Sequence, residues 1–156
     1  MLGFSLSSIE IEVITRLVVA VVLGACIGLE RSLAGKHAGM RTYALVALGS
    51  CLFTVAGVIA SYQLVEFAGV NPLQLAGSVI IGIGFIGAGL VTYNRESHPE
   101  LTTASGIWVT AAVGLAVGFG YFAVALAAAI LGILIFSVLL RLENKLRNRF
   151  GKTDQD

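Results

Sequence analysis

The sequence predicts an all-α integral membrane protein with about five transmembrane helices, and three observations lead to this fold class. Hydrophobic residues make up 57% of the 156 residues and charged residues only 12%, with a mean hydropathy of +0.93. A soluble domain has about a quarter of its residues charged. The charges lie between apolar stretches long enough to cross about 30 Å of hydrocarbon. We therefore expect a transmembrane helical domain over residues 1–140 and a short charged tail over 141–156.

The apolar stretches define five spans in chain order. They cover residues 9–29, 42–61, 73–93, 101–118 and 119–140. The first span carries its charges, Glu10, Glu12 and Arg16, near its start. The apolar run over residues 101–140 is too long for one crossing, so the chain must turn near Gly118. No small-residue cleavage site precedes Glu30, and we expect the first span to remain in the protein.

The lysines and arginines predict the orientation of the spans, because basic residues in short loops are kept on the cytoplasmic side. With five spans, all of them except Arg16 fall on the same side of the membrane. This group comprises Arg31, Lys36, Arg41, Arg95, Arg141, Lys145, Arg147, Arg149 and Lys152. An even number of spans would separate the basic first loop from the basic tail. We therefore predict an N-terminus outside the cell and a cytoplasmic C-terminus.

Small residues at four-residue spacing indicate close packing between helices. The third span contains GIGFIGAG, in which Gly82, Gly84 and Gly87 formally match the G-x-G-x-x-G pattern of dinucleotide-binding folds. That pattern needs a preceding strand and a crevice open to water, whereas these glycines lie inside an apolar span. Trp108 falls deep inside the fourth span rather than at the membrane interface, which favours packing in the core.

The residues expected at helix contacts are Gly24, Gly28, Gly82, Gly84, Gly87, Gly89, Trp108, Gly114 and Gly118. For the third span, the alternative is a flexible helix that lines a polar pathway. Five thin helices enclose little internal volume, and this favours a homo-oligomer, with a dimer as the simplest form.

Polar side chains collect near the expected cytoplasmic ends of the spans and form the candidate site. They are Glu30, Arg31, Arg41, Thr42, Thr102 and Thr103. Glu30 and Arg41 bracket the first inner loop, and a charge pair between them would hold that loop closed. The alternative is that these residues are ordinary interfacial caps and anchors, and both interpretations stay open. No carboxylate lies deep in a span, which weakens the case for a carboxylate-based cation pathway.

The sequence offers little for catalysis or for binding a metal. Cys26 and Cys51 lie in apolar runs without metal-ligand spacing, and His37 and His98 are isolated in expected loops. No pair of nucleophile and base is evident. We therefore expect no enzyme activity, no cofactor, no metal and no nucleic acid, and we expect the lipid bilayer and other membrane proteins as partners.

Three segments, in this order, resemble the membrane domain of the MgtC/SapB family. They are ACIGLERSLAGKHAGMRTYALVALGS (25–50), GIGFIGAGLV (82–91) and LTTASGIWVTAAVGLAVGFGYF (101–122). The elements G-x-E-R…A-G-x-R-T, G-I-G-F-x-G-A-G and L-T-T-A…W are together far more specific than any one of them. The resemblance covers nearly the whole chain and implies a bacterial inner-membrane protein with about five spans. Because no soluble domain follows Gly151, it further implies the short, SapB-like form.

The chain also departs from the family pattern in two places. Residues 71–74 read Asn-Pro-Leu-Gln where the family often has Asp-Pro-x-Arg, and Glu100 stands where the family often has glycine. The family is associated with survival under magnesium limitation. The resemblance thus implies a non-enzymatic modulator of membrane ion homeostasis, with a transporter or channel for a cation or small solute as the alternative. The modulator predicts a closed interior, and the transporter predicts a continuous polar path from the candidate site to the outer face.

Overall fold

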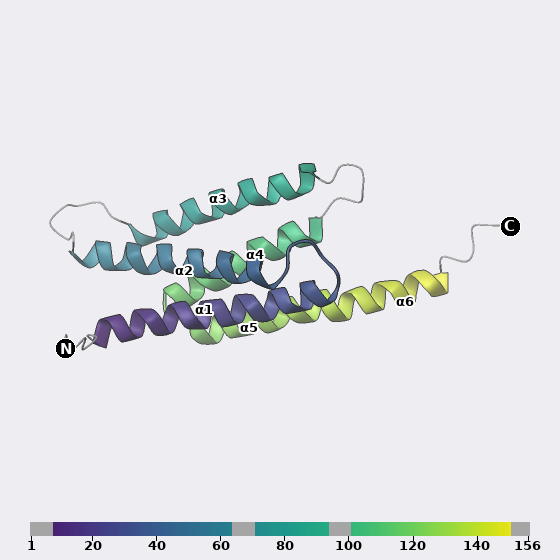
Figure 1. Ribbon diagram of the computed structural model, residues 1–156, viewed down its shortest axis with the longest axis horizontal. Coiled ribbons are helices and arrows are strands. Elements are labelled where there is room, and N and C mark those ends of the chain that lie inside the picture. Colours follow the sequence, from purple (N-terminus) through teal and green to yellow (C-terminus); the bar gives the residue numbers. More distant parts are fainter. Residues whose placement is uncertain (1–7, 64–70, 94–100, 151–156) are drawn as a thin grey trace, which may run out of the picture.

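The computed structural model describes residues 8–63, 71–93 and 101–150, and over these ranges it is a bundle of helices joined by short turns (Figure 1). The helices are α1 (Ser8–Leu33), α2 (Met40–Gln63), α3 (Pro72–Tyr93), α4 (Leu101–Gly118), α5 (Phe122–Leu134), the π-helix η1 (Ile135–Leu139) and α6 (Leu140–Phe150). The first four are each long and apolar enough to cross a membrane, and α5, η1 and α6 together form a fifth continuous helix. The predicted all-α fold with five spans is confirmed.

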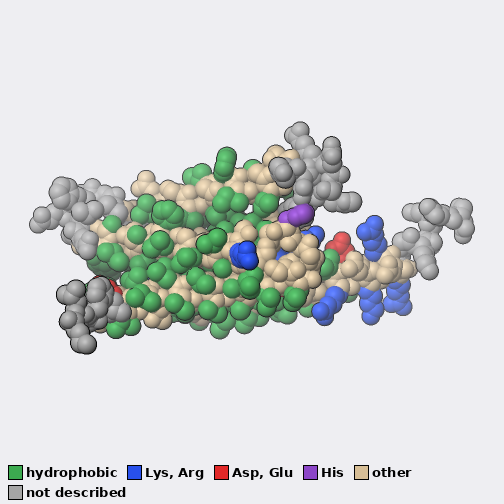
Figure 2. Space-filling view, viewed as in Figure 1, with side chains coloured by type: hydrophobic (Ala, Val, Ile, Leu, Met, Phe, Trp, Pro, Cys, Tyr) green, Lys and Arg blue, Asp and Glu red, His purple; other side chains and the backbone are tan. Residues whose placement is uncertain are grey.

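Helix α4 is the centre of the bundle. More than half of its span is buried, against about a tenth for α3, which packs only on α2 and α4 among the described helices. Helices α1 and α5 lie side by side along the opposite flank (Figure 1). The core lies where α1, α2 and α4 meet, and its fully buried members include Ala20, Ile27, Tyr43, Ala47, Cys51, Ile107 and Val117. The faces that point away from this core are apolar, as a lipid-facing surface requires (Figure 2).

Two glycines in the left-handed region form the tight connections. Gly35 (φ 69°) follows the end of α1, where the Lys36 N–H donates to the carbonyl oxygen of Arg31 over 3.0 Å. Gly120 (φ 86°) completes the turn after α4. Residues with a Cβ rarely adopt this conformation, so glycine permits both turns. The second turn delays the start of the fifth helix to Phe122, rather than the residue 119 expected from hydropathy.

Glycines on α1 bring its backbone against α2. A Cβ on Gly24 would lie 2.7 Å from the Ala47 Cβ, and a Cβ on Gly28 would lie 2.6 Å from the Met40 Cα. Because Cβ atoms do not approach other heavy atoms so closely, any larger residue would force the two helices apart.

The same contact occurs between α4 and α2. A Cβ on Gly114 would overlap the carbonyl oxygen of Ala47, and a Cβ on Gly118 would lie 2.5 Å from the Thr54 Cβ. Helix α2 is therefore held between α1 and α4 by glycines on both sides.

The glycines of α3 have a different environment. Nothing lies within 4 Å of a Cβ built on Gly82, Gly84 or Gly89, and a Cβ on Gly87 would meet only the Ala104 Cβ, at 3.7 Å. The close packing expected at Gly82, Gly84 and Gly89 is therefore not formed within one chain. A local glycine pattern signals close packing but does not specify which helix face has a neighbour.

The expectation that Trp108 packs in the core is wrong. Its side chain is 50% exposed, because its neighbours Ile107, Thr110 and Ala111 occupy the inward face of α4. Trp108 is thus part of the outer, lipid-facing surface.

Candidate functional site

Arg31 is a buried charge near one end of the bundle, and the apolar stripe of α1 places it there. The inward positions of α1 are Ala20, Gly24, Ile27, Gly28 and Arg31, spaced as one face of a helix. Arg31 is only 2% exposed. A charge that is nearly removed from water needs a partner, because its desolvation is costly.

Glu30 supplies the opposite charge. The Arg31 Nε donates a hydrogen bond to Glu30 Oε2 over 2.5 Å, and the Arg31 Nη2 lies 2.5 Å from the same oxygen as an ion-pair contact without hydrogen-bond geometry. On its other side, the Arg31 Cζ lies 3.8 Å from the centre of the Phe136 ring, within the range of a cation–π interaction. The guanidinium is thus held between a carboxylate and an aromatic face.

Phe136 reaches this position because it continues the inward face of α5, on which Ala125, Ala129 and Gly132 are also buried. It is the second residue of the π-helix η1, and π-helical turns are frequent at functional sites. Phe136 is 7% exposed and lies over Gly106 of α4, where a Cβ would come within 2.5 Å of both the Phe136 Cζ and the Tyr43 Oη. Gly106 therefore leaves the space that the Phe136 ring and the Tyr43 hydroxyl occupy.

Tyr43 and Thr103 complete the cluster, and both are fully buried. The Tyr43 Oη donates a hydrogen bond of 3.3 Å to the carbonyl oxygen of Thr103, in the first turn of α4. This bond gives the buried phenol a hydrogen-bond acceptor in the core. We call the group formed by Glu30, Arg31, Tyr43, Thr103, Gly106 and Phe136 the Arg31 site.

Only part of the candidate cluster expected from the sequence belongs to this site. Glu30, Arg31 and Thr103 do, whereas Arg41 and Thr102 are exposed and Thr42 faces the space between α2 and α3. The expected pair between Glu30 and Arg41 is wrong. Helix α1 continues to Leu33, so Glu30 stays beside Arg31 on the last turns of α1 and pairs with it.

Three members of the Arg31 site, Tyr43, Gly106 and Phe136, were not expected from the sequence. Tyr43 begins a stripe of α2 that continues through Ala47, Cys51 and Thr54, and this helical spacing could have marked it as inward-facing. Phe136 keeps the helical spacing of Ala125, Ala129 and Gly132, but this run is apolar on every face, so the spacing alone does not mark the inward one.

The other candidate residues have simpler surroundings. Cys51 is buried, and Cys26 and His37 are exposed. Arg95 and His98 lie outside the described residues. Within the described part of the chain, no three His, Cys, Asp or Glu side chains are grouped so that they could hold a metal ion.

A second arginine lies near the opposite end of α1. The Arg16 Nη1 donates a hydrogen bond of 2.6 Å to the carbonyl oxygen of Gly118, at the end of α4, and its Nη2 pairs with Glu12 Oε1 at 2.5 Å. A cation at a helix C-terminus is favoured by the helix dipole and by the free carbonyls there. Arg16 thus caps α4.

The interior between Arg16 and the Arg31 site is closed and apolar. The hydroxyls that lie there are used within their own helices: Thr54 Oγ1 donates to the Ser50 carbonyl and Thr110 Oγ1 to the Gly106 carbonyl, each over 2.8 Å. Ser50 Oγ is buried without a hydrogen-bond partner among the described residues. Helix backbones that meet at glycines fill the remaining space, so the described helices have no continuous polar path through this region.

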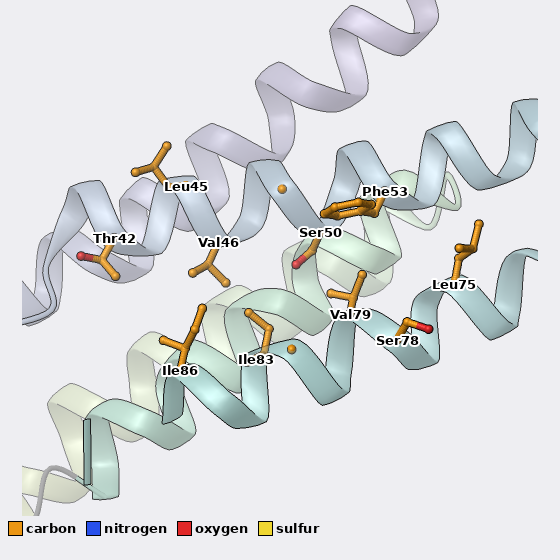
Figure 3. A pocket seen from close by; sticks show the side chains of 12 residues that line it. Thr42, Leu45, Val46, Ser50, Phe53, Leu75, Ser78, Val79, Ile83 and Ile86 are labelled. Atoms are coloured by element: carbon orange, nitrogen blue, oxygen red, sulfur yellow. The ribbon is translucent and has the colours of Figure 1, made fainter. Parts of the chain in front are cut away.

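A groove of about 660 Å³ lies between α2 and α3. Val46 and Ile83 point into it from opposite walls (Figure 3). Gly49 and Gly82 also line it, and their missing side chains leave it open. The lining is almost wholly apolar, so the groove suits an acyl chain or an apolar side chain better than an ion.

Five apolar helices around a closed core, with the buried Arg31 and the partly buried Arg16 near opposite ends of α1, define a multi-pass helical membrane protein. A profile of the MgtC family matches residues 17–145, and the chain belongs to this family. The family resemblance expected from the three sequence elements is thereby confirmed.

Several curated bacterial proteins are similar to this chain. YhiD of Escherichia coli K12, named "Putative magnesium transporter YhiD", is 36% identical over 140 residues, which cover 88% of this chain and 65% of YhiD. SapB of Bacillus subtilis is 36% identical, with 77% of this chain and 53% of SapB covered. MgtC of Salmonella typhimurium strain 14028s is 38% identical, with 82% of this chain and 52% of MgtC covered. The chain thus spans between half and two thirds of these relatives, and no solved structure matches it.

Proposed function

We propose that this protein is a non-enzymatic component of the bacterial inner membrane that modulates ion homeostasis under magnesium limitation. The observation that carries the proposal is the closed interior between Arg16 and the Arg31 site. A transporter needs a polar path that opens to both sides, whereas a protein that acts on other membrane proteins needs a rigid scaffold and a distinctive surface. The link to magnesium rests on the family and on the name of YhiD.

The Arg31 site is the element through which we propose that the protein acts. Removing an ion pair from water is costly, and an apolar pair of the same size would often be equally stable or more so. Retaining Glu30 and Arg31 beside Phe136 therefore suggests a task other than holding the helices together. We propose that a change in this ion pair alters the surface offered to a partner membrane protein.

The distribution of charge supports an N-terminus outside and a cytoplasmic C-terminus. Lys36 and Arg41 lie at the same end of the bundle as the Arg31 site. The basic residues of α6 extend from this end, where Figure 2 shows them gathered. Arg16 alone lies near the other end among the described basic residues. By the preference for basic residues on the inner side, the Arg31 site faces the cytoplasm.

The empty glycine face of α3 supports a homo-oligomer, with a dimer as the simplest form. Glycine costs about 1 kcal/mol relative to alanine inside a helix, and at Gly24, Gly28 and Gly114 that cost is accompanied by close packing. Gly77 and Gly84 have no neighbour within 4 Å of a Cβ built on them. Contact with α3 of a second copy would give these small residues the close packing that they lack.

The first experiment compares transport with function in cells. The purified chain is reconstituted in sealed vesicles, and fluxes of Mg²⁺, protons and monovalent cations are measured. In parallel, growth at limiting magnesium is measured in a strain that depends on this protein, with Arg31→Met as the test variant and Arg41→Met as its matched control. Both substitutions remove an arginine at the same end of the bundle, but only Arg31 is buried in the site.

The proposal expects no flux above empty vesicles, a growth defect for Arg31→Met and normal growth for Arg41→Met. Flux that Arg31→Met abolishes would overturn it. Equal growth of the two variants would refute the assignment of the function to the Arg31 site.

The alternative function is a transporter or channel for a cation or a small solute. It is favoured by the groove between α2 and α3, which the hydroxyl-bearing residues Thr42, Ser50 and Ser78 help to line. If a second copy closed this groove from the lipid side, the hydroxyls would line a path at the interface. Flux that is lost in Ser78→Ala and retained in Ser105→Ala, an exposed serine outside the groove, would favour this alternative.

A further inference from the structure

Helix α6 is a strongly amphipathic helix that leaves the bundle. It continues from η1 and packs on no other described helix, so its apolar side chains have no neighbour to cover them (Figure 1). Leu142 is 48% exposed and Leu146 is 46% exposed. Residues 122–139 already span about 27 Å at 1.5 Å per residue, which nearly equals the hydrocarbon thickness. A straight helix would therefore place Leu146 about 10 Å further out, beyond the acyl chains.

The side chains of α6 are sorted into faces. Leu139, Leu142 and Leu146 lie within a sector about 60° wide on a helical wheel. Three faces surround this leucine stripe, with Arg141, Lys145 and Arg149 on one side, Glu143 and Arg147 on the other, and Asn144 and Asn148 opposite. Four basic residues against one acidic residue give α6 a net charge of +3. Basic flanks with an uncharged polar back are typical of a helix that lies at a membrane surface.

Pairing with α6 of a second copy fits this pattern less well. If Leu139, Leu142 and Leu146 occupied the a, d and a positions of a coiled coil, the next d position would be Arg149. An arginine at that position would place like charges together across the seam. The charges of α6 are instead complementary to an anionic surface.

We propose that α6 docks on the anionic leaflet of the membrane that holds the bundle. Leu142 and Leu146 enter the boundary of the acyl chains, and Arg141, Lys145 and Arg149 lie among the lipid phosphates. The bend that this requires falls after Phe136, because Phe136 is fixed by its contacts with Gly106 and Arg31. The π-helix η1 ends at Leu139, and π-bulges are frequent sites of kinks. The ligand is an anionic phospholipid surface, and its binding does not depend on the function proposed above.

The test uses the depth of a tryptophan placed on α6 of the full chain. Trp108 is the only tryptophan, and it lies on the outer surface, so Trp108→Phe provides a dark background. Leu146→Trp reports on the leucine stripe and Asn148→Trp on the opposite face, which makes the second variant a matched control. Each is reconstituted in phosphatidylcholine vesicles with or without phosphatidylglycerol, and quenching by acyl-brominated lipid is measured.

Docking predicts strong quenching for Leu146→Trp in anionic vesicles, weak quenching in neutral vesicles, and weak quenching for Asn148→Trp in both. Quenching should fall between ~0.1 and ~1 M salt, over which the screening length shrinks from about 10 to 3 Å. Replacing Arg141, Lys145 and Arg149 together by glutamine should shift the docking equilibrium about 100-fold, from about fivefold per basic residue. Equal quenching in the two kinds of vesicle would overturn the proposal. A weak signal in both that varies with the protein-to-lipid ratio would also overturn it, because a second copy would then cover the stripe.

Discussion

The glycine contact between α4 and α2 makes a sharp prediction about stability. In Gly114→Ala the new methyl group would overlap the carbonyl oxygen of Ala47 and lie 2.9 Å from the Ser50 Cβ. The overlap is with backbone, which cannot rotate away, so the two helices must separate. Overpacking of this kind costs about 1–3 kcal/mol, and the better helix propensity of alanine offsets up to about 1 kcal/mol. We expect a net loss of about 1–2 kcal/mol.

The measurement is reversible unfolding in mixed micelles of dodecyl maltoside and sodium dodecyl sulfate, followed by the loss of helical circular dichroism. Gly84→Ala is the matched control, because nothing lies within 4 Å of its added methyl group. At protein concentrations low enough for a monomer, this control should be as stable as the parent or up to about 1 kcal/mol more stable. If Gly114→Ala unfolds at the same point as Gly84→Ala, the reasoning from helix spacing is refuted. A loss for Gly84→Ala that appears only at high protein concentration would support the proposed dimer.

Three further predictions concern the polar contacts. Glu30→Gln should destabilise the bundle more than the double variant Glu30→Gln, Arg31→Met, because the single change leaves a buried cation unpaired at a cost of about 3–5 kcal/mol. Unfolding in mixed micelles compares the two variants, and equal losses of stability would contradict this prediction. Tyr43→Phe removes the long hydrogen bond to the Thr103 carbonyl, whose loss should cost about 0.5–1 kcal/mol in the same assay, whereas a loss above about 3 kcal/mol would show that the hydroxyl has further roles. Arg16→Met removes the cap from the terminal carbonyl of α4, so hydrogen exchange should accelerate in the last turn of α4 and not in its first turn.

Much of the fold could be predicted from the sequence, because its causes are local. Length and hydropathy locate the spans, and the alternation of basic and neutral connections supports an odd number of them. A turn near Gly118 is required because no single helix could hold the apolar run. These features depend on the bilayer and on the nearest neighbours in the chain, and neither requires knowledge of tertiary packing.

The candidate site was predicted only in part, because its members depend on where each helix ends and how it is rotated. Glu30 and Arg41 flank the same loop, which suggested a pair between them. The additional turn of α1, from the expected end at residue 29 to Leu33, keeps Glu30 on the helix, where it pairs with Arg31 instead. Phe136 faces Arg31 because it follows Ala129 and Gly132 on the inward face of the fifth helix. Which face of a helix turns inward is decided by packing between helices, and a run that is apolar on every face does not reveal it.

The two arginines of α1 determine which parts of the bundle can rearrange. They are 15 positions apart, or about 22 Å along the axis, and both project from the buried side of α1. Arg16 holds the last carbonyl of α4, and Arg31 contacts Phe136, which rests on Gly106 of α4. If α1 slid along the neighbouring helices, Arg16 would lose the carbonyl of Gly118 and Arg31 would lose the Phe136 ring, while each arginine would keep its glutamate on α1. Among the described residues, α3 makes no such contact, and its glycine face and the groove beside it can accept a new neighbour without breaking a charged contact. We therefore expect regulation by a partner to change the contacts of α3 while the spacing of α1 and α4 stays fixed.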